Sequence, residues 1–153
     1  MQIWELLIRE QVSETIARYA NAGDGGRLEE LTEQFTARGI LEMPPNQRAA
    51  GRQDIQAMLK SGTQQKPPVA FAGQKAIIRH YTATTQFRLV TEARVEAITY
   101  FQAWTAVGPD HWGRYFDTLV PVGDRWLFEH RVAKVEGYAS GGWYDVNRPR
   151  PGS

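Results

Sequence analysis

The stretch from residue 77 to residue 89, IIRHYTATTQFRL, decides the fold class of this chain. It is rich in Ile, Thr, Tyr and Phe, which suit the pleated surface of a β-sheet. Three further segments of the same kind follow at residues 94–107, 112–122 and 124–135. Because short connections favour antiparallel neighbours, and Gly123-Asp124 favours a tight hairpin, this half of the chain predicts four long antiparallel strands.

The first half of the chain is predicted to be mainly helical. From Gln2 to Ala22 the apolar residues recur at helical spacing, and the glycines around Asp24 end that helix. The other expected elements are a second helix with the buried stripe Leu28, Leu31 and Phe35, a short strand at 37–43, a third helix starting near Gly51, and a loop at 61–75. Helices followed by antiparallel strands predict one α+β domain over residues 1–137. A Gly- and Pro-rich tail, partly packed, is expected at 138–153.

Composition narrows the classes of function. The chain has 153 residues, 42% of them hydrophobic, and a formal net charge of +1, which fits one globular domain without the basic footprint of a nucleic-acid binder. The absence of cysteine excludes disulfides and thiolate chemistry and fits a reducing compartment. No apolar run is long enough to span a membrane, and the N-terminal stretch carries charges inside its apolar part, unlike a signal peptide. We therefore expect a cytoplasmic protein with neither nucleic acid nor membrane as a partner.

No metal or cofactor is predicted. His111, in the turn predicted at Gly108-Pro109-Asp110, and His130 have no partner at metal-ligand spacing. The chain also has no Gly-rich phosphate loop, no dinucleotide fingerprint and no Gly-x-Ser-x-Gly motif.

The strand at 94–107 carries apolar side chains on both of its faces. Tyr100 and Trp104 lie on one face, and Phe101 and Ala103 on the other. The helices can cover one face of the sheet. A second copy of the chain is the expected cover of the other, so we predict a homodimer.

Four local patterns occur along the chain in the order typical of one known family. They are Ala17-Arg18-Tyr19 followed by Asp24, Gly51 with Ile55, Arg79-His80, and Gly113-Arg114-Tyr115-Phe116-Asp117 followed by Trp126 and Arg131. Together they resemble the SnoaL-like group of the nuclear transport factor 2-like superfamily, over nearly the whole chain. This resemblance implies a cone-shaped α+β barrel, in which a curved, mostly antiparallel sheet wraps around the N-terminal helices and encloses a deep pocket.

Within that superfamily the chain is similar to scytalone dehydratase, bile-acid 7α-dehydratase and hexachlorocyclohexane dehydrochlorinase. Those enzymes use an Asp–His pair, usually with a Tyr and sometimes an Arg, to remove a proton and expel a leaving group. The resemblance implies catalytic roles for four residues here: His80, Asp24, Tyr19 and Arg131.

Elementary chemistry gives each of these residues a role. Histidine is the side chain whose ordinary pKa suits a base near neutral pH, so His80 is the candidate base. A carboxylate such as Asp24 would hold its ring in one tautomer. Tyr19 or Arg131 would stabilise the oxygen that gains negative charge.

Each residue also has a structural alternative. Asp24 could cap the second helix, and His80 could be an ordinary half-buried histidine. Tyr19 could be a core tyrosine, and Arg131 could pair with Glu129 or Glu136 on the outside of the sheet.

Five aromatic side chains are expected to form the substrate-binding wall, with plain core as the alternative: Trp104, Trp112, Tyr115, Tyr100 and Phe87. The sequence thus predicts a cofactor-free lyase of the dehydratase type, or an isomerase, acting on a hydrophobic oxygenated small molecule of steroid, polyketide or aromatic type. The alternative is a non-catalytic ligand-binding or assembly module of the same fold, because this fold hosts many functions.

Overall fold

The structure, a computed structural model, describes residues 1–63, 73 and 77–148 of the chain. In chain order its elements are α1 (Ile3–Asp24), α2 (Leu28–Thr32), β1 (Phe35–Met43), β2 (Gln47–Ala50), α3 (Arg52–Thr63), β3 (Ile78–Val90), β4 (Val95–Thr105), β5 (Gly108–Val122), β6 (Arg125–Tyr138) and α4 (Trp143–Asn147). None of the described helices has the length and apolar composition needed to cross a membrane.

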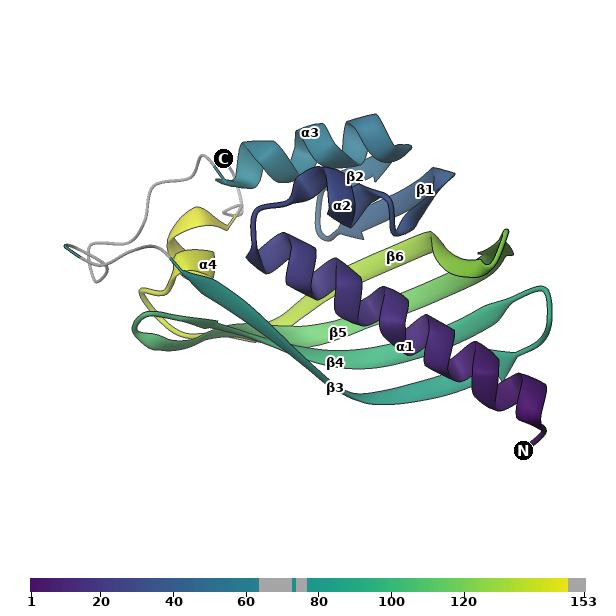
Figure 1. The fold of residues 1–153 in the computed structure, drawn as a ribbon. Helices are drawn as coiled ribbons and strands as arrows, with labels where there is room; N and C mark the ends of the chain where they lie inside the picture. Colours follow the sequence, from purple (N-terminus) through teal and green to yellow (C-terminus); the bar gives the residue numbers. More distant parts are fainter. Residues whose placement is uncertain (64–72, 74–76, 149–153) are drawn as a thin grey trace.

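All six strands belong to one curved sheet, in the order β2-β1-β6-β5-β4-β3. Only β1 and β6 run parallel, and the other neighbouring strands are antiparallel. Helix α1 crosses one face of the sheet, while α2 and α3 lie near its β1–β2 end (Figure 1). The prediction of an α+β fold with long antiparallel strands after N-terminal helices is confirmed.

Three local predictions differ from the structure. Phe35 begins β1 instead of extending the second helix, which is only five residues long. Strand β2 was not predicted, because its four residues, QRAA, carry no strand signal. Strand β5 begins at Gly108 rather than at Trp112, so Asp110 and His111 lie on a strand and not in a turn. Most of the loop predicted at 61–75 lies outside the described residues.

Helix α1 packs on the sheet through a single buried stripe. Val12, Ile16 and Tyr19 are buried and follow one another at helical spacing, as the sequence predicts. The Thr15 hydroxyl donates a hydrogen bond of 2.6 Å to the carbonyl oxygen of Trp126 on β6, which fixes the helix along the strands. The end of α1 is thereby held over the concave face of the sheet.

The largest fully buried side chain beneath α1 is that of Arg131. Its guanidinium group donates two hydrogen bonds of 2.7 Å to the two carboxylate oxygens of Asp117, the residue opposite it on β5. The guanidinium carbon lies 4.3, 4.1 and 4.0 Å from the ring centroids of Tyr19, Tyr115 and Phe128. Burial alone would lower the pKa of Arg131, but the charge of Asp117, its hydrogen bonds to Arg131 and the nearby tyrosines together raise that pKa. We call Arg131 and these four residues the arginine cage.

Replacing Arg131 by Ala is expected to lower the free energy of unfolding by about 3–5 kcal/mol, because it leaves the Asp117 carboxylate buried without its partner. Urea denaturation measures this loss. Arg114→Ala is the matched control, since it breaks the exposed pair with Glu136 on the same two strands and should cost far less. Equal losses for the two variants would show that the cage does not hold the core.

Candidate active site

A cavity of about 540 Å³ opens between the concave face of the sheet and the helices. Its walls come from the end of α1, from α2 and α3, from the connection between β1 and β2, from strands β3 to β6, and from α4. Most of the wall is apolar, with Leu31 and Met58 on the helical side and Phe101 on the sheet. Polar side chains reach it at a few points, and two of these are histidines.

The structure brings Asp24 and His80 together at this cavity. Asp24 is the last residue of α1, and His80 lies near the start of β3. The Asp24 carboxylate is 2.7 Å from His80 Nδ1 through one oxygen and accepts the His80 backbone N–H at 2.8 Å through the other. Since a carboxylate can only accept, Nδ1 carries a proton in this pair, and in the neutral ring Nε2 keeps its lone pair. Asp24 does not cap the second helix, whose N-cap position is Arg27.

A second Asp–His pair, which the sequence analysis missed, lies on the same cavity. His111 Nδ1 is 2.7 Å from the carboxylate of Asp110, whose side chain is fully buried. Burial alone would raise the pKa of Asp110, but hydrogen bonds from His111 and from two backbone N–H groups lower it below its ordinary value. His111, like His80, therefore presents Nε2 away from its carboxylate.

The two imidazole rings are close enough to act on one small molecule. Their centroids are 6.0 Å apart, and the ring of Phe101 lies 6.3 Å from His80 and 5.9 Å from His111. Phe101 in turn stacks on Tyr115 with 4.5 Å between ring centroids. A planar apolar ligand can therefore lie against aromatic rings while its polar atoms meet the two histidines.

Tyr19 and Tyr115 both line the cavity and both belong to the arginine cage. Burial is the main cause that raises the pKa of each phenol above its ordinary value. Both hydroxyl groups therefore keep their protons through the neutral range and can donate hydrogen bonds to a ligand.

Two sets of residues from the sequence analysis lie elsewhere. Arg131 is not part of the cavity wall, because it is fully buried in the cage and paired with Asp117 rather than with either predicted glutamate. Among the five aromatic residues expected to bind substrate, only Tyr115 lines the cavity.

The alternation of side chains along the strands explains the other four. Tyr100 and Trp104 point to the outer face of the sheet, because their neighbours Phe101 and Ala103 point inward. Trp112 is also 42% exposed. Phe87 packs under the guanidinium group of Arg9 on α1, outside the cavity.

A β-bulge explains why Asp110 and His111 were missed. On β5, His111 pairs with Ala103 and Pro109 pairs with Trp104, which leaves Asp110 as an extra residue between the two pairs. Such a bulge re-aims side chains, so that two consecutive residues can face the same side of a sheet. The sequence Gly108-Pro109-Asp110 has the composition of a turn and carries no sign of the bulge.

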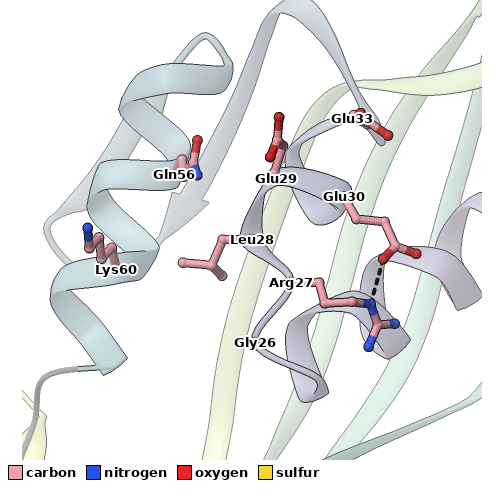
Figure 2. A pocket seen from close by; sticks show the side chains of 8 residues that line it. All are labelled: Gly26, Arg27, Leu28, Glu29, Glu30, Glu33, Gln56 and Lys60. Carbon is pink, nitrogen blue, oxygen red and sulfur yellow. Dashed lines mark hydrogen bonds and ion pairs between the residues drawn. The ribbon is translucent and has the colours of Figure 1, made fainter.

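Another hollow, of about 760 Å³ and more open to solvent, lies between α2 and α3. Figure 2 shows its lining, with Glu29, Glu30 and Glu33 near one side and Gln56 and Lys60 on α3. It holds no histidine. Within the part of the chain that the structure describes, no three His, Asp or Glu side chains converge to hold a metal ion.

Comparison with known proteins places this chain in a family. The family model of the SnoaL-like domain matches residues 4–132. Comparison with curated proteins gives no match.

Solved structures share the fold. A putative scytalone dehydratase from Novosphingobium aromaticivorans is 19% identical, with 91% of each chain covered and a TM-score of 0.76. An NTF2-like protein with a cystatin-like fold from the same species is 22% identical, with 89% of this chain and 87% of that chain covered and a TM-score of 0.72. A protein from Catenulispora acidiphila in complex with S-DNPA is 23% identical, with 86% and 95% covered and a TM-score of 0.73. Since the family model spans most of the chain, the protein belongs to the SnoaL-like family, within the nuclear transport factor 2-like fold.

Proposed function

We propose that the protein is a cofactor-independent lyase of the dehydratase type, or an isomerase, that acts on a hydrophobic oxygenated small molecule by Asp–His acid–base catalysis. The observation that carries the proposal is the 2.7 Å contact between Asp24 and His80 Nδ1 at the wall of an apolar cavity. That contact leaves Nε2 of His80 able to take a proton, and Asp24 stabilises the imidazolium that forms.

The first step is removal of a proton from a carbon atom beside a carbonyl group. His80 Nε2 takes the proton, and the electron pair of the C–H bond moves onto the carbonyl oxygen as an enolate. The hydroxyl groups of Tyr19 and Tyr115 can donate hydrogen bonds to that oxygen, because both phenols keep their protons. These donors are fixed by the arginine cage before the substrate arrives.

The second step distinguishes a lyase from an isomerase. In a lyase the enolate expels a hydroxyl group from the next carbon, and a protonated imidazole supplies the proton that makes it water. That imidazole is His80, which the first step protonated, and His111, 6.0 Å from it ring to ring, can accept a hydrogen bond from the departing hydroxyl group at Nε2. In an isomerase the proton returns to a different carbon, which moves the double bond. The likeness to a protein named a putative scytalone dehydratase supports the lyase form.

His80→Ala is expected to lower kcat/KM by about 10²–10⁴, because the variant lacks the base. Unfolding free energy should change little, since the His80 side chain is partly exposed at the cavity wall. The substrate is to be found by screening hydroxylated steroids, polyketides and aromatic alcohols for loss of water or movement of a double bond. His130→Ala, which removes a histidine bonded to Glu42 away from the cavity, is the control. Full turnover by His80→Ala would show that His80 is not the base, and a parent protein that turns over none of the screened compounds would leave a binding module of the same fold as the function.

Tyr19→Phe is expected to reduce kcat by about 10²–10³, because removing one donor to the developing oxyanion typically costs that much. Burial raises the pKa of Tyr19, so in the parent enzyme this hydroxyl should not ionise as the pH rises toward the ordinary phenol value of about 10. A pH profile of kcat checks both points. Tyr81→Phe, on the exposed outer face, is the control and should behave like the parent. A fall in activity between pH 8 and about 9.5 that Tyr19→Phe abolishes would contradict the raised pKa of Tyr19.

The outer face of the sheet supports a proposal about assembly. Tyr81, Tyr100, Trp104 and Trp112 are 62%, 52%, 42% and 42% exposed there. Exposed apolar faces of this kind are typical of contacts between proteins. We propose that two copies of the chain cover this face in a homodimer.

Light scattering at micromolar concentration should therefore give twice the mass of the chain. Trp104→Glu should shift the mass toward that of one chain, because it places a charge in the apolar contact. Arg88→Glu, also on β3–β4 but away from the aromatic group, should stay dimeric. A monomeric parent protein would contradict the proposal.

A further inference from the structure

We propose that Asp110 is a positioning residue whose single carboxylate holds α4 against the cavity and also holds the His111 ring in one tautomer. Closure of the cavity by α4 and the tautomer of His111 are therefore coupled. The coupling is a property of the folded chain. Its effect on turnover rests on the proposed function.

Asp110 attaches α4 to the sheet. Asp110 Oδ1 accepts the backbone N–H of Trp143 at 2.5 Å, and Oδ2 accepts that of Tyr144 at 3.1 Å. These are the first two residues of α4, where N–H groups have no partner within the helix. The Asp110 carbonyl oxygen also accepts the N–H of Ala139 at 2.7 Å. The short helix is thus attached to one residue of β5, at the end of the sheet where β4 turns into β5 (Figure 1).

The same carboxylate of Asp110 also holds the ring of His111. The oxygen that accepts the Tyr144 N–H is also the one that is 2.7 Å from His111 Nδ1. The Tyr144 ring lies over the His111 ring, with 5.1 Å between centroids and 30° between planes. The side chain of His111 is only 12% exposed. Any movement of α4 therefore alters both the covering of His111 and the set of donors on its carboxylate.

In this proposal helix α4 is a cover that can open. It has five residues, none of them buried, and a helix of that length has no stability of its own. Trp143, Tyr144, Asn147 and Arg148 nevertheless line the cavity. A ligand that contacts them favours the closed state by its greater affinity for it. Because Asp110 connects the two, ligand binding then also fixes His111 with its proton on Nδ1.

The test uses NMR on the full chain, with two variants that reach Asp110 from opposite sides. Asp110→Asn removes the charge and places an amide against His111. Gly142→Ala acts from the α4 side, because its Cβ would lie 2.6 Å from Asp110 Oδ1. Its φ of −72° suits alanine, so this contact is the main strain. Asp24→Asn is the matched control, since it changes the other Asp–His pair and does not touch α4.

Amide exchange at Trp143 and Tyr144 and the ring ¹⁵N shifts of both histidines are the readouts. Asp110→Asn and Gly142→Ala should both speed exchange at these amides by about tenfold or more and shift the His111 ring signals. Asp24→Asn should shift the His80 signals and leave α4 exchange unchanged. If Gly142→Ala speeds exchange in α4 while His111 keeps its parent spectrum, the coupling does not exist. Unchanged α4 exchange in Asp110→Asn would overturn the role of Asp110.

Turnover separates this inference from the proposed function. Once a substrate is known, Gly142→Ala should lower kcat as well as raise KM, because the coupling also disturbs His111. A cover that only helped to bind the substrate would change KM alone. A rise in KM with unchanged kcat would contradict the coupling while leaving the Asp24–His80 mechanism intact. Coupling seen by NMR together with full turnover by His80→Ala would instead leave the inference standing and remove the proposed function.

Discussion

The buried ion pair between Arg131 and Asp117 is the interaction on which the rest of the structure depends. It joins β5 to β6 across the sheet, and the rings of Tyr19, Tyr115 and Phe128 surround its guanidinium group. A charge in the core is tolerated only when its partner and its surroundings are fixed. Helix α1 must therefore lie where Tyr19 meets the cage, and this same placement brings the end of α1 to the cavity.

The candidate site inherits its geometry from that placement. Asp24 ends α1 directly opposite the start of β3, so its carboxylate reaches both the backbone and the ring of His80. The rings of Tyr19 and Tyr115 pack on the guanidinium group of Arg131, and both residues also line the cavity. Tyr19 and Tyr115 thus belong to both the core and the candidate site. Because the core fixes their rings, their hydroxyl groups are held in place before any ligand binds. Preorganised donors of this kind are what electrostatic catalysis needs.

Both histidines are held by a carboxylate on Nδ1, but the two carboxylates come from different parts of the chain. In each pair a carboxylate holds Nδ1 and leaves Nε2 free toward the cavity. Asp24 comes from a helix end 56 residues before its histidine, whereas Asp110 is the immediate neighbour of His111 and reaches it through a β-bulge. Unlike Asp24, Asp110 also accepts two backbone N–H groups of α4.

The sequence by itself determined the α+β class, the four long strands and the stripe of α1, since these follow from local periodicity and propensity. It also pointed to Asp24, His80 and Tyr19, through motifs that resemble a family. Only the tertiary structure decided which side of the sheet each aromatic residue faces, that Arg131 belongs to the core, and that Asp110 and His111 reach the cavity. Strand alternation and pairing register fix those outcomes, and a single extra residue in β5 reverses the side to which a residue points.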